Sequence, residues 1–229
     1  MATTYQMDSW VQYVNQLLHL SSVSIVDRTL YKLCLSAATD FTQAMTIAEI
    51  ISRELLPING YDRKTMTWAG PGTLDSGNHR HDMEEITTTW TGSGGDFSFQ
   101  TAILLADCPD NTPSYLISSV NSGTDLITTS SAHFRSQDDP IMIESDGGSV
   151  PAGSDRTTLY YADVVSSTTL KLLDAPAGSV VDLTDTGSGT LYIRNAKGTP
   201  RYYIAETTSL TVFDAITFTY GITNGVDDV

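Results

Sequence analysis

Two histidines separated by a single residue come closest, in this sequence, to a site for chemistry. Side chains two positions apart on an extended strand point to the same face, so His79 and His81 could offer two imidazole nitrogens to one metal ion. A zinc site needs at least one more protein ligand, and the nearest carboxylates are Asp82 and Glu84. We expect a solvent-exposed or subunit-contact loop here, and no metal site.

Two acidic pairs invite a calcium interpretation. Asp138 and Asp139 are adjacent, and Glu144 and Asp146 flank a single serine. Calcium loops space their oxygen ligands over about a dozen residues in a recognisable order, which neither pair has. We therefore expect no bound calcium.

The sequence carries no familiar catalytic motif. It contains no GxSxG elbow, no HExxH, no phosphate loop ending in GK and no CxxC. Its two cysteines, Cys34 and Cys108, each end an apolar run, which is typical of buried, reduced thiols. We expect a protein that is not an enzyme and that needs no cofactor.

The charge balance narrows the choice of partners. The formal net charge is −15 and the pI is near 4.3, so the surface field repels nucleic acid and anionic membranes. This acidity serves solubility or attracts a basic partner surface. The N-terminus lacks the pattern of a classical export signal, which predicts synthesis in the cytoplasm without export.

Helical spacing is confined to the first quarter of the chain. Residues 8–20 place an apolar stripe on one face, which predicts an amphipathic helix that packs on its own chain or on a neighbouring subunit: Trp10, Val11, Val14, Leu17 and Leu18. A second, short helix is predicted by the capping box of Thr46 and Glu49, in front of Ile50, Ile51 and Leu55.

From Tyr61 onward the hydrophobic period is two, which is typical of strands. Turn-rich clusters at 109–113 and 195–200 divide this region, and the strand pattern resumes after the second cluster. We predict a mainly β protein, a β-sandwich of which the jelly roll is one form, with one or two short helices. Residues 1–112 and 197–229 form the sandwich, and residues 113–196 form a small inserted antiparallel β domain.

The inserted segment contains short runs of alternating hydrophobicity separated by glycine and proline. YLISSV, DLITTS, PIMIES, TLYYADVV, TTLKLL, VVDLT and TLYIR are each predicted to be strands. Their inward side chains are predicted to form a core: Leu126, Ile141, Ile143, Tyr160, Leu170, Leu172, Leu183 and Ile193.

The same segment resembles a β-module found in virion and tail proteins of tailed bacteriophages. The resemblance rests on TTSSAH, DPIMIESDGGSVPAG, TLYYADVVSSTTLKL and AGSVVDLTDTGSGTLYI. One departure is Phe134, which follows His133 where the pattern often has glycine, so the turn there is expected to differ. The flanking parts resemble small phage structural proteins through YKLCLS, INGYDRKTMTW, GGDFSFQTAILLADC, RYYIAE and ITFTYGIT.

This resemblance implies a non-enzymatic virion protein, favouring a capsid decoration or cement protein on the head surface. A tail, neck or baseplate accessory protein is the first alternative, and a carbohydrate-binding host-recognition module is the second. The expected partners are the major capsid protein or other virion proteins. We also expect a homo-oligomer, with a trimer favoured, whose interface uses apolar and aromatic side chains: Trp10, Val14, Leu17, Tyr161 and Tyr203.

Overall fold

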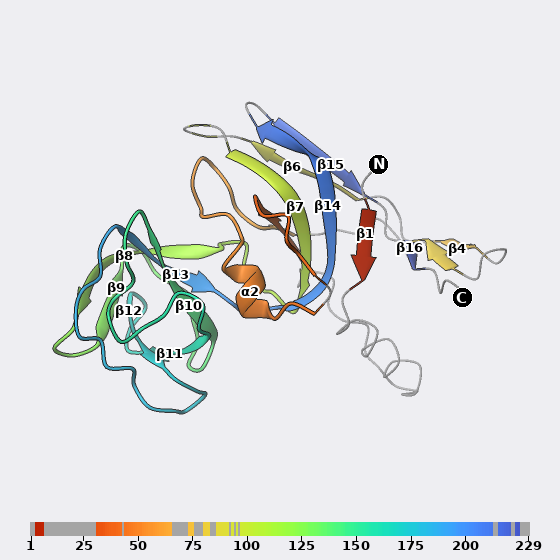
Figure 1. The fold of residues 1–229 in the computed structure, drawn as a ribbon. Coiled ribbons are helices and arrows are strands. Elements are labelled where there is room, and N and C mark those ends of the chain that lie inside the picture. The colour runs from red at the N-terminus through yellow and green to blue at the C-terminus, as the bar shows by residue number, and fades with distance from the viewer. Residues whose placement is uncertain are drawn as a thin grey trace, which may run out of the picture.

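A computed structural model of the chain gives the fold described here. It describes residues 3–6, 31–42, 44–65, 73–75, 80–82, 86–91, 93, 95, 97–212, 215–220 and 223–224. Over these residues the chain is mainly β, with antiparallel sheets and very little helix (Figure 1). This confirms the predicted fold class, a β-sandwich protein that carries a small antiparallel domain.

The larger open sheet has five antiparallel strands in the order β1-β14-β7-β2-β3. Its bounds are β1 (Thr3–Gln6), β2 (Lys32–Ser36), β3 (Lys64–Thr65), β7 (Phe97–Ala106) and β14 (Thr199–Val212). The long strands β7 and β14 pair with each other and curve through the whole sheet (Figure 1). A strand from the last part of the sequence therefore completes a sheet begun by the first part.

Two smaller antiparallel sheets accompany it. One pairs β15 (Ala215–Tyr220) with β6 (Ile86–Thr91), and the other has the order β16-β5-β4. The latter strands are β4 (Thr73–Asp75), β5 (Arg80–Asp82) and β16 (Thr223–Asn224). Trp90 of β6 is fully buried and donates its indole N–H to the Asp62 carbonyl at 2.7 Å, which ties β6 to the segment before β3.

Strand β2 is buried on both faces. Leu33, Cys34 and Leu35 are all fully buried. Neighbours on a strand point to opposite faces. Cys34 packs in one apolar cluster with Ile50 and Ile51, so Leu33 and Leu35 face the other side of the sheet.

The helix α2 (Ile47–Ile51) begins at the predicted capping box. Thr46 accepts the Glu49 N–H at 3.3 Å, and the Glu49 carboxylate accepts the Thr46 N–H at 2.7 Å. The helix is shorter than its pattern predicts, because the Leu55 N–H bonds to the Leu35 carbonyl in place of a helical partner. Within the described residues, no helix is long and apolar enough to cross a membrane. The predicted helix at 8–20 lies outside the described residues.

The inserted segment forms a closed six-stranded antiparallel barrel with the order β10-β11-β12-β9-β8-β13 (Figure 1). Its strands are β8 (Ser114–Asn121), β9 (Leu126–Thr129), β10 (Pro140–Asp146), β11 (Tyr160–Val164), β12 (Thr169–Leu173) and β13 (Thr190–Asn195). All predicted core residues except Leu126 lie in its buried cluster. Leu126 is half-buried, and its neighbour Ile127 takes the core position.

The prediction that VVDLT is a strand is wrong. Beyond a single bridge between Val180 and Leu173, the segment before β13 is irregular. The carboxylate of Asp125 accepts the Leu183 N–H, and that of Asp185 accepts the N–H groups of Ala152 and Gly187. These side-chain bonds satisfy backbone groups that a strand would pair in a ladder. Leu183 nevertheless reaches the barrel core.

Candidate functional site

The predicted histidine pair falls only partly within the described residues. Arg80–Asp82 is the strand β5, with His81 opposite Leu74 and Asn224, where we expected a loop. His79 and Glu84 lie outside the described residues. Among the residues whose side chains the structure describes, no group of three or more metal-ligating side chains gathers.

The predicted interface residues are dispersed. Tyr161 lies in β11, half-buried, opposite Leu173 and Pro140. Tyr203 lies in β14, opposite Tyr5 and Ile103. Trp10, Val14 and Leu17 lie outside the described residues. Whether any of these contacts a second subunit stays a prediction.

One member of each acidic pair, Asp139 and Glu144, makes ion pairs within the chain. Asp139 is largely buried and bonds to Lys197 Nζ at 2.8 Å and to the Ser136 N–H at 2.9 Å. Glu144 bonds to two arginines, and Asp138 accepts the Ala177 N–H. Several of these contacts belong to a larger buried cluster between the barrel and the five-stranded sheet, which we call the junction.

The junction has an apolar part. Met142 lies on β10 between the core residues Ile141 and Ile143, so its side chain points out of the barrel. It is buried in the cluster that also contains Ile50 and Ile103 from the sheet region, and the half-buried Leu159 packs against the same cluster. Burying a side chain of this size stabilises by about 1.5–3 kcal/mol.

The polar part of the junction begins with Glu54 and Arg63, both fully buried. Arg63 binds the carboxylate in two places, Nε to Oε1 at 2.8 Å and Nη2 to Oε2 at 2.6 Å. The Tyr61 hydroxyl adds a third bond to Oε1 at 2.9 Å. Arg63 also donates to the carbonyl of Asn195, the last residue of the barrel, at 2.7 Å.

Arg194 makes the reciprocal contact from the barrel side. Its Nη1 binds Glu144 at 2.8 Å, and its Nη2 binds the Glu54 carbonyl at 2.9 Å and lies 3.5 Å from the Glu54 carboxylate. Arg194 is almost completely buried. Glu54 thus holds arginines from both parts of the molecule, and Arg156 adds a more exposed bond to Glu144 at 2.7 Å.

A second set of contacts joins the barrel to the segment by which the chain enters it. Arg135 pairs with Asp110, donates to the Asn195 amide oxygen at 2.9 Å, and lies over the Tyr115 ring with 5.6 Å to the ring centre. The Asn195 amide also reaches Asp110 at 3.3 Å. Both chain crossings, one before β8 and one after β13, are therefore held by charged hydrogen bonds.

Electrostatics keep Glu54 charged. Burial alone would raise the pKa of Glu54, but Arg63 and Arg194 outweigh it and hold that pKa below its ordinary value. Burial raises the pKa of the Cys34 thiol, and the Glu54 charge raises it further. Burial also raises the pKa of Cys108, although Arg63 partly opposes the shift. Both cysteines are free and buried, as predicted, and little thiolate is present at neutral pH.

Sequence reasoning missed the junction because its members are far apart along the chain. Arg194 and Glu54 are separated by 140 positions. Nothing in TLYIR distinguishes a buried arginine from one at a solvated strand end. The only signal is indirect, since the position of Arg194 opposite Met142 follows once the strand pairing is known.

An open groove of about 480 Å³ lies on the barrel between β8 and the loop before β13. The two strands pair only from Ser114 to Leu116, so they separate beyond that point. Small polar residues and a few aliphatic ones line the groove, without an aromatic side chain: Ile117, Ser118, Ser119, Val120, Thr186, Gly187, Ser188, Gly189, Thr190 and Leu191.

Comparisons of the chain with protein-family models, with curated proteins and with solved structures give no match.

Proposed function

We propose that this chain is a non-enzymatic structural protein of a tailed-bacteriophage virion, and specifically a decoration or cement protein on the capsid surface. The observation that supports this most directly is the junction. Buried arginines from both parts of the molecule share the Glu54 carboxylate, so the barrel is attached at a fixed angle. A fixed angle suits a protein that must bridge neighbouring subunits of a shell.

The proposed mechanism is mechanical. The sheet region and the barrel contact different places on the shell, with the major capsid protein or other virion proteins as partners and other copies of the chain as neighbours, a trimer being favoured. Bound copies add buried interface that resists the pressure of packaged DNA. The acidic surface suits a position outside the capsid, away from the genome.

A tail, neck or baseplate accessory role is the alternative within the same class, because the resembling module also occurs in tail proteins. A carbohydrate-binding role has less support. The barrel groove offers hydroxyl and backbone groups, but it lacks the aromatic side chains on which sugar rings commonly stack.

Antibody labelling of purified virions, viewed by electron microscopy, tests the proposal. Decoration predicts labels spread over the head and a copy number, from quantitative mass spectrometry, comparable with the number of capsid subunits. A few labels at one vertex or along the tail would favour the accessory role. Absence of the chain from intact virions would overturn both. The control is the same labelling of virions produced from a genome in which the gene for this chain is disrupted.

A further inference from the structure

Phe134 is an exposed aromatic residue in an unfavourable backbone conformation. Its side chain has 76% of its surface exposed, and its φ is 49°. This left-handed region is uncommon for residues other than glycine, asparagine and aspartate, and is costly for a bulky side chain. The chain therefore incurs a backbone penalty at Phe134 without burying its ring.

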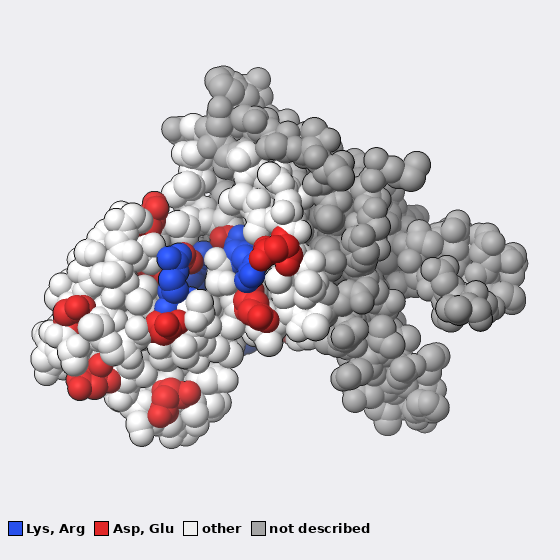
Figure 2. Space-filling model, in the orientation of Figure 1, with Lys and Arg blue, Asp and Glu red and all other residues white. Residues whose placement is uncertain are grey.

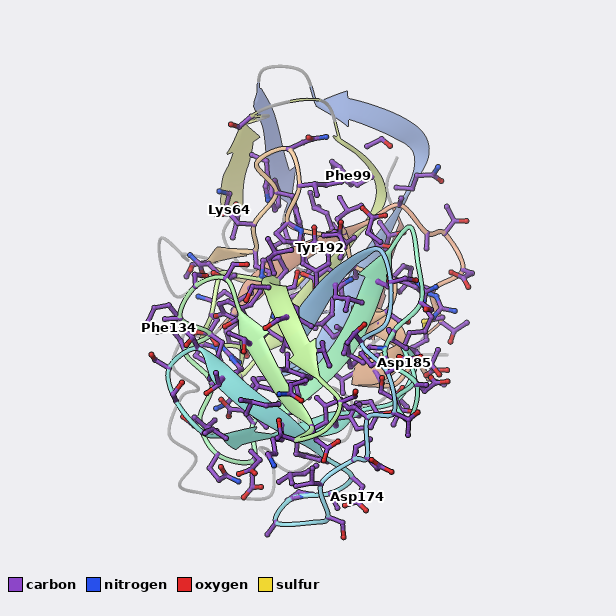
Figure 3. All side chains as sticks on the ribbon, turned by 90° about the vertical axis from the view of Figure 1, so that its left-hand side faces the viewer. Lys64, Phe99, Phe134, Asp174, Asp185 and Tyr192 are labelled. Atoms are coloured by element: carbon purple, nitrogen blue, oxygen red, sulfur yellow. The ribbon has the colours of Figure 1, made fainter. Side chains whose placement is uncertain are left out.

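The neighbours of Phe134 hold it in this position. His133 and Arg135 are both buried, and the Arg135 N–H bonds to His133 Nδ1 at 3.0 Å. The His133 N–H bonds in turn to the Ser167 carbonyl at 2.9 Å. With both neighbours directed inward, the ring between them points away from the barrel, as Figure 3 shows. A glycine here would satisfy the same backbone without an exposed ring.

A second exposed apolar side chain belongs to the turn that is hydrogen-bonded to this segment. Val165 has 57% of its surface exposed, at the turn between β11 and β12. The Ser167 carbonyl binds the residue before Phe134, and the Val164 N–H binds Gln137 at 2.9 Å, three residues after it. These two tethers hold residues 133–137 against residues 164–167, the turn that carries Val165. We call the side chains of Phe134 and Val165 the Phe134 patch.

The net charge of the barrel indicates what could cover the patch. Barrel residues 114–195 contain ten Asp and Glu against four Lys and Arg. Arg135, Arg194, Asp139 and Glu144 are buried in ion pairs, which leaves eight acidic residues against two basic ones. Figure 2 shows the barrel face opposite the one that carries Phe134, and there the basic side chains gather near the seam beside α2 while acidic ones lie elsewhere on the barrel. A second copy of this chain would bring the same negative charge, whereas a basic surface would be attracted.

We propose that the Phe134 patch is the anchor by which the barrel docks on a positively charged protein surface, with the ring seated in an apolar pocket of that surface. Aromatic side chains are the usual anchors of protein interfaces, and the net negative charge of the barrel attracts a basic partner. The inference rests on the proposed function only for identifying this partner as a virion protein.

The variant Phe134→Gly tests the proposal, because it removes the ring and relieves the backbone. The probe is a synthetic peptide of alternating lysine and leucine, titrated into the full chain by calorimetry. We expect Phe134→Gly to weaken binding at least tenfold, Val165→Ser to weaken it less, and Val180→Ser, which alters an exposed valine elsewhere on the barrel, to leave it unchanged. Added NaCl should weaken binding to the unaltered chain.

The same variant separates a binding role from a structural one. Relief of the backbone penalty should raise the melting temperature by roughly 2–4 °C for a chain of this size. A lower melting temperature would show that the ring stabilises the fold, and unchanged peptide affinity would show that it binds nothing basic. If Phe134→Gly instead abolishes self-association in sedimentation, the occupant of the patch is a second copy of the chain and not a basic partner. If it abolishes binding to phosphatidylserine vesicles, the occupant is a membrane. If Phe134→Gly loses the peptide while virions lack the chain, the patch stands and the proposed function fails.

Discussion

Two arginines of this chain make ion pairs of similar length in very different surroundings. Arg194 binds Glu144 at 2.8 Å with both side chains at least nine-tenths buried, whereas Arg53 binds Asp40 at 2.9 Å with 29% and 63% of the side chains exposed. A buried charge that loses its partner keeps its desolvation penalty, whereas water replaces a partner at the surface. The same kind of contact should therefore contribute differently to the free energy of unfolding at the two sites.

Replacing Arg194 with methionine should lower the free energy of unfolding by about 3–5 kcal/mol, because Glu144 and Glu54 would lose a buried cationic partner. Arg53→Met is the matched control, and it should leave the unfolding curve unchanged within error. Urea denaturation of both variants, followed by tryptophan fluorescence, provides the comparison. Equal losses in the two variants would mean that burial does not set the strength of the junction.

At the scale of elements, the loop before β13 depends on a glycine that is tightly enclosed. Gly189 has a φ of 76°, and a Cβ there would lie 2.6 Å from the Asp146 carbonyl oxygen. Gly147 has nearly the same φ, 75°, but its Cβ would meet nothing within 4 Å. The two positions therefore share the conformational cost of a side chain and differ in the space around it.

Gly147→Ala should destabilise the chain by about 1–2 kcal/mol, which is the cost of a left-handed residue that is not glycine. Gly189→Ala should cost about 1–3 kcal/mol more, because the added methyl group would press on backbone atoms of the Asp146 turn. Thermal and urea unfolding of the two variants measure this difference. Similar losses of stability in the two variants would show that the loop before β13 moves aside freely to accommodate the added methyl group.

A structural feature could be predicted from the sequence when the residues that cause it lie close together along the chain. The capping box of Thr46 and the alternation of Ile141 and Ile143 are set within a few residues, and both are confirmed. The failure at VVDLT arose because Asp125, far along the chain, supplies a bond that makes a strand unnecessary. The junction could not be predicted for the same reason, since Glu54 meets Arg194 only after the barrel has closed and docked.

At the scale of the whole molecule, the junction makes the barrel and the sheet depend on each other. Met142 fills an apolar site in the sheet region, and Arg63 and Arg194 both rely on Glu54. Separating the two parts would expose apolar surface and leave buried charges without partners. At neutral pH we therefore expect a single unfolding transition, even though each part has its own core.

Acid should break this dependence. Arg63 and Arg194 hold the pKa of Glu54 below its ordinary 4.5, and Lys197 and Arg135 help to hold that of Asp139 below 3.8, in both cases against the effect of burial. A carboxylate with a lowered pKa in the folded chain stabilises it fully above the ordinary value, and this contribution is lost as the pH falls through the lowered one. Stability should thus be nearly constant from pH 7 to about 5 and fall steeply below about 4.

Scanning calorimetry between pH 7 and 3 tests this expectation. The single transition of the unaltered chain should shift to lower temperature below about pH 4 and divide into two, one for the barrel and one for the sheet region. Arg194→Met should show two transitions already at pH 7 and a smaller change on acidification, since Glu54 has then lost one of the charges that lower its pKa. A single transition at the same temperature throughout this range would mean that the barrel is held by its apolar contacts, and that the buried ion pairs do not couple it to the sheet.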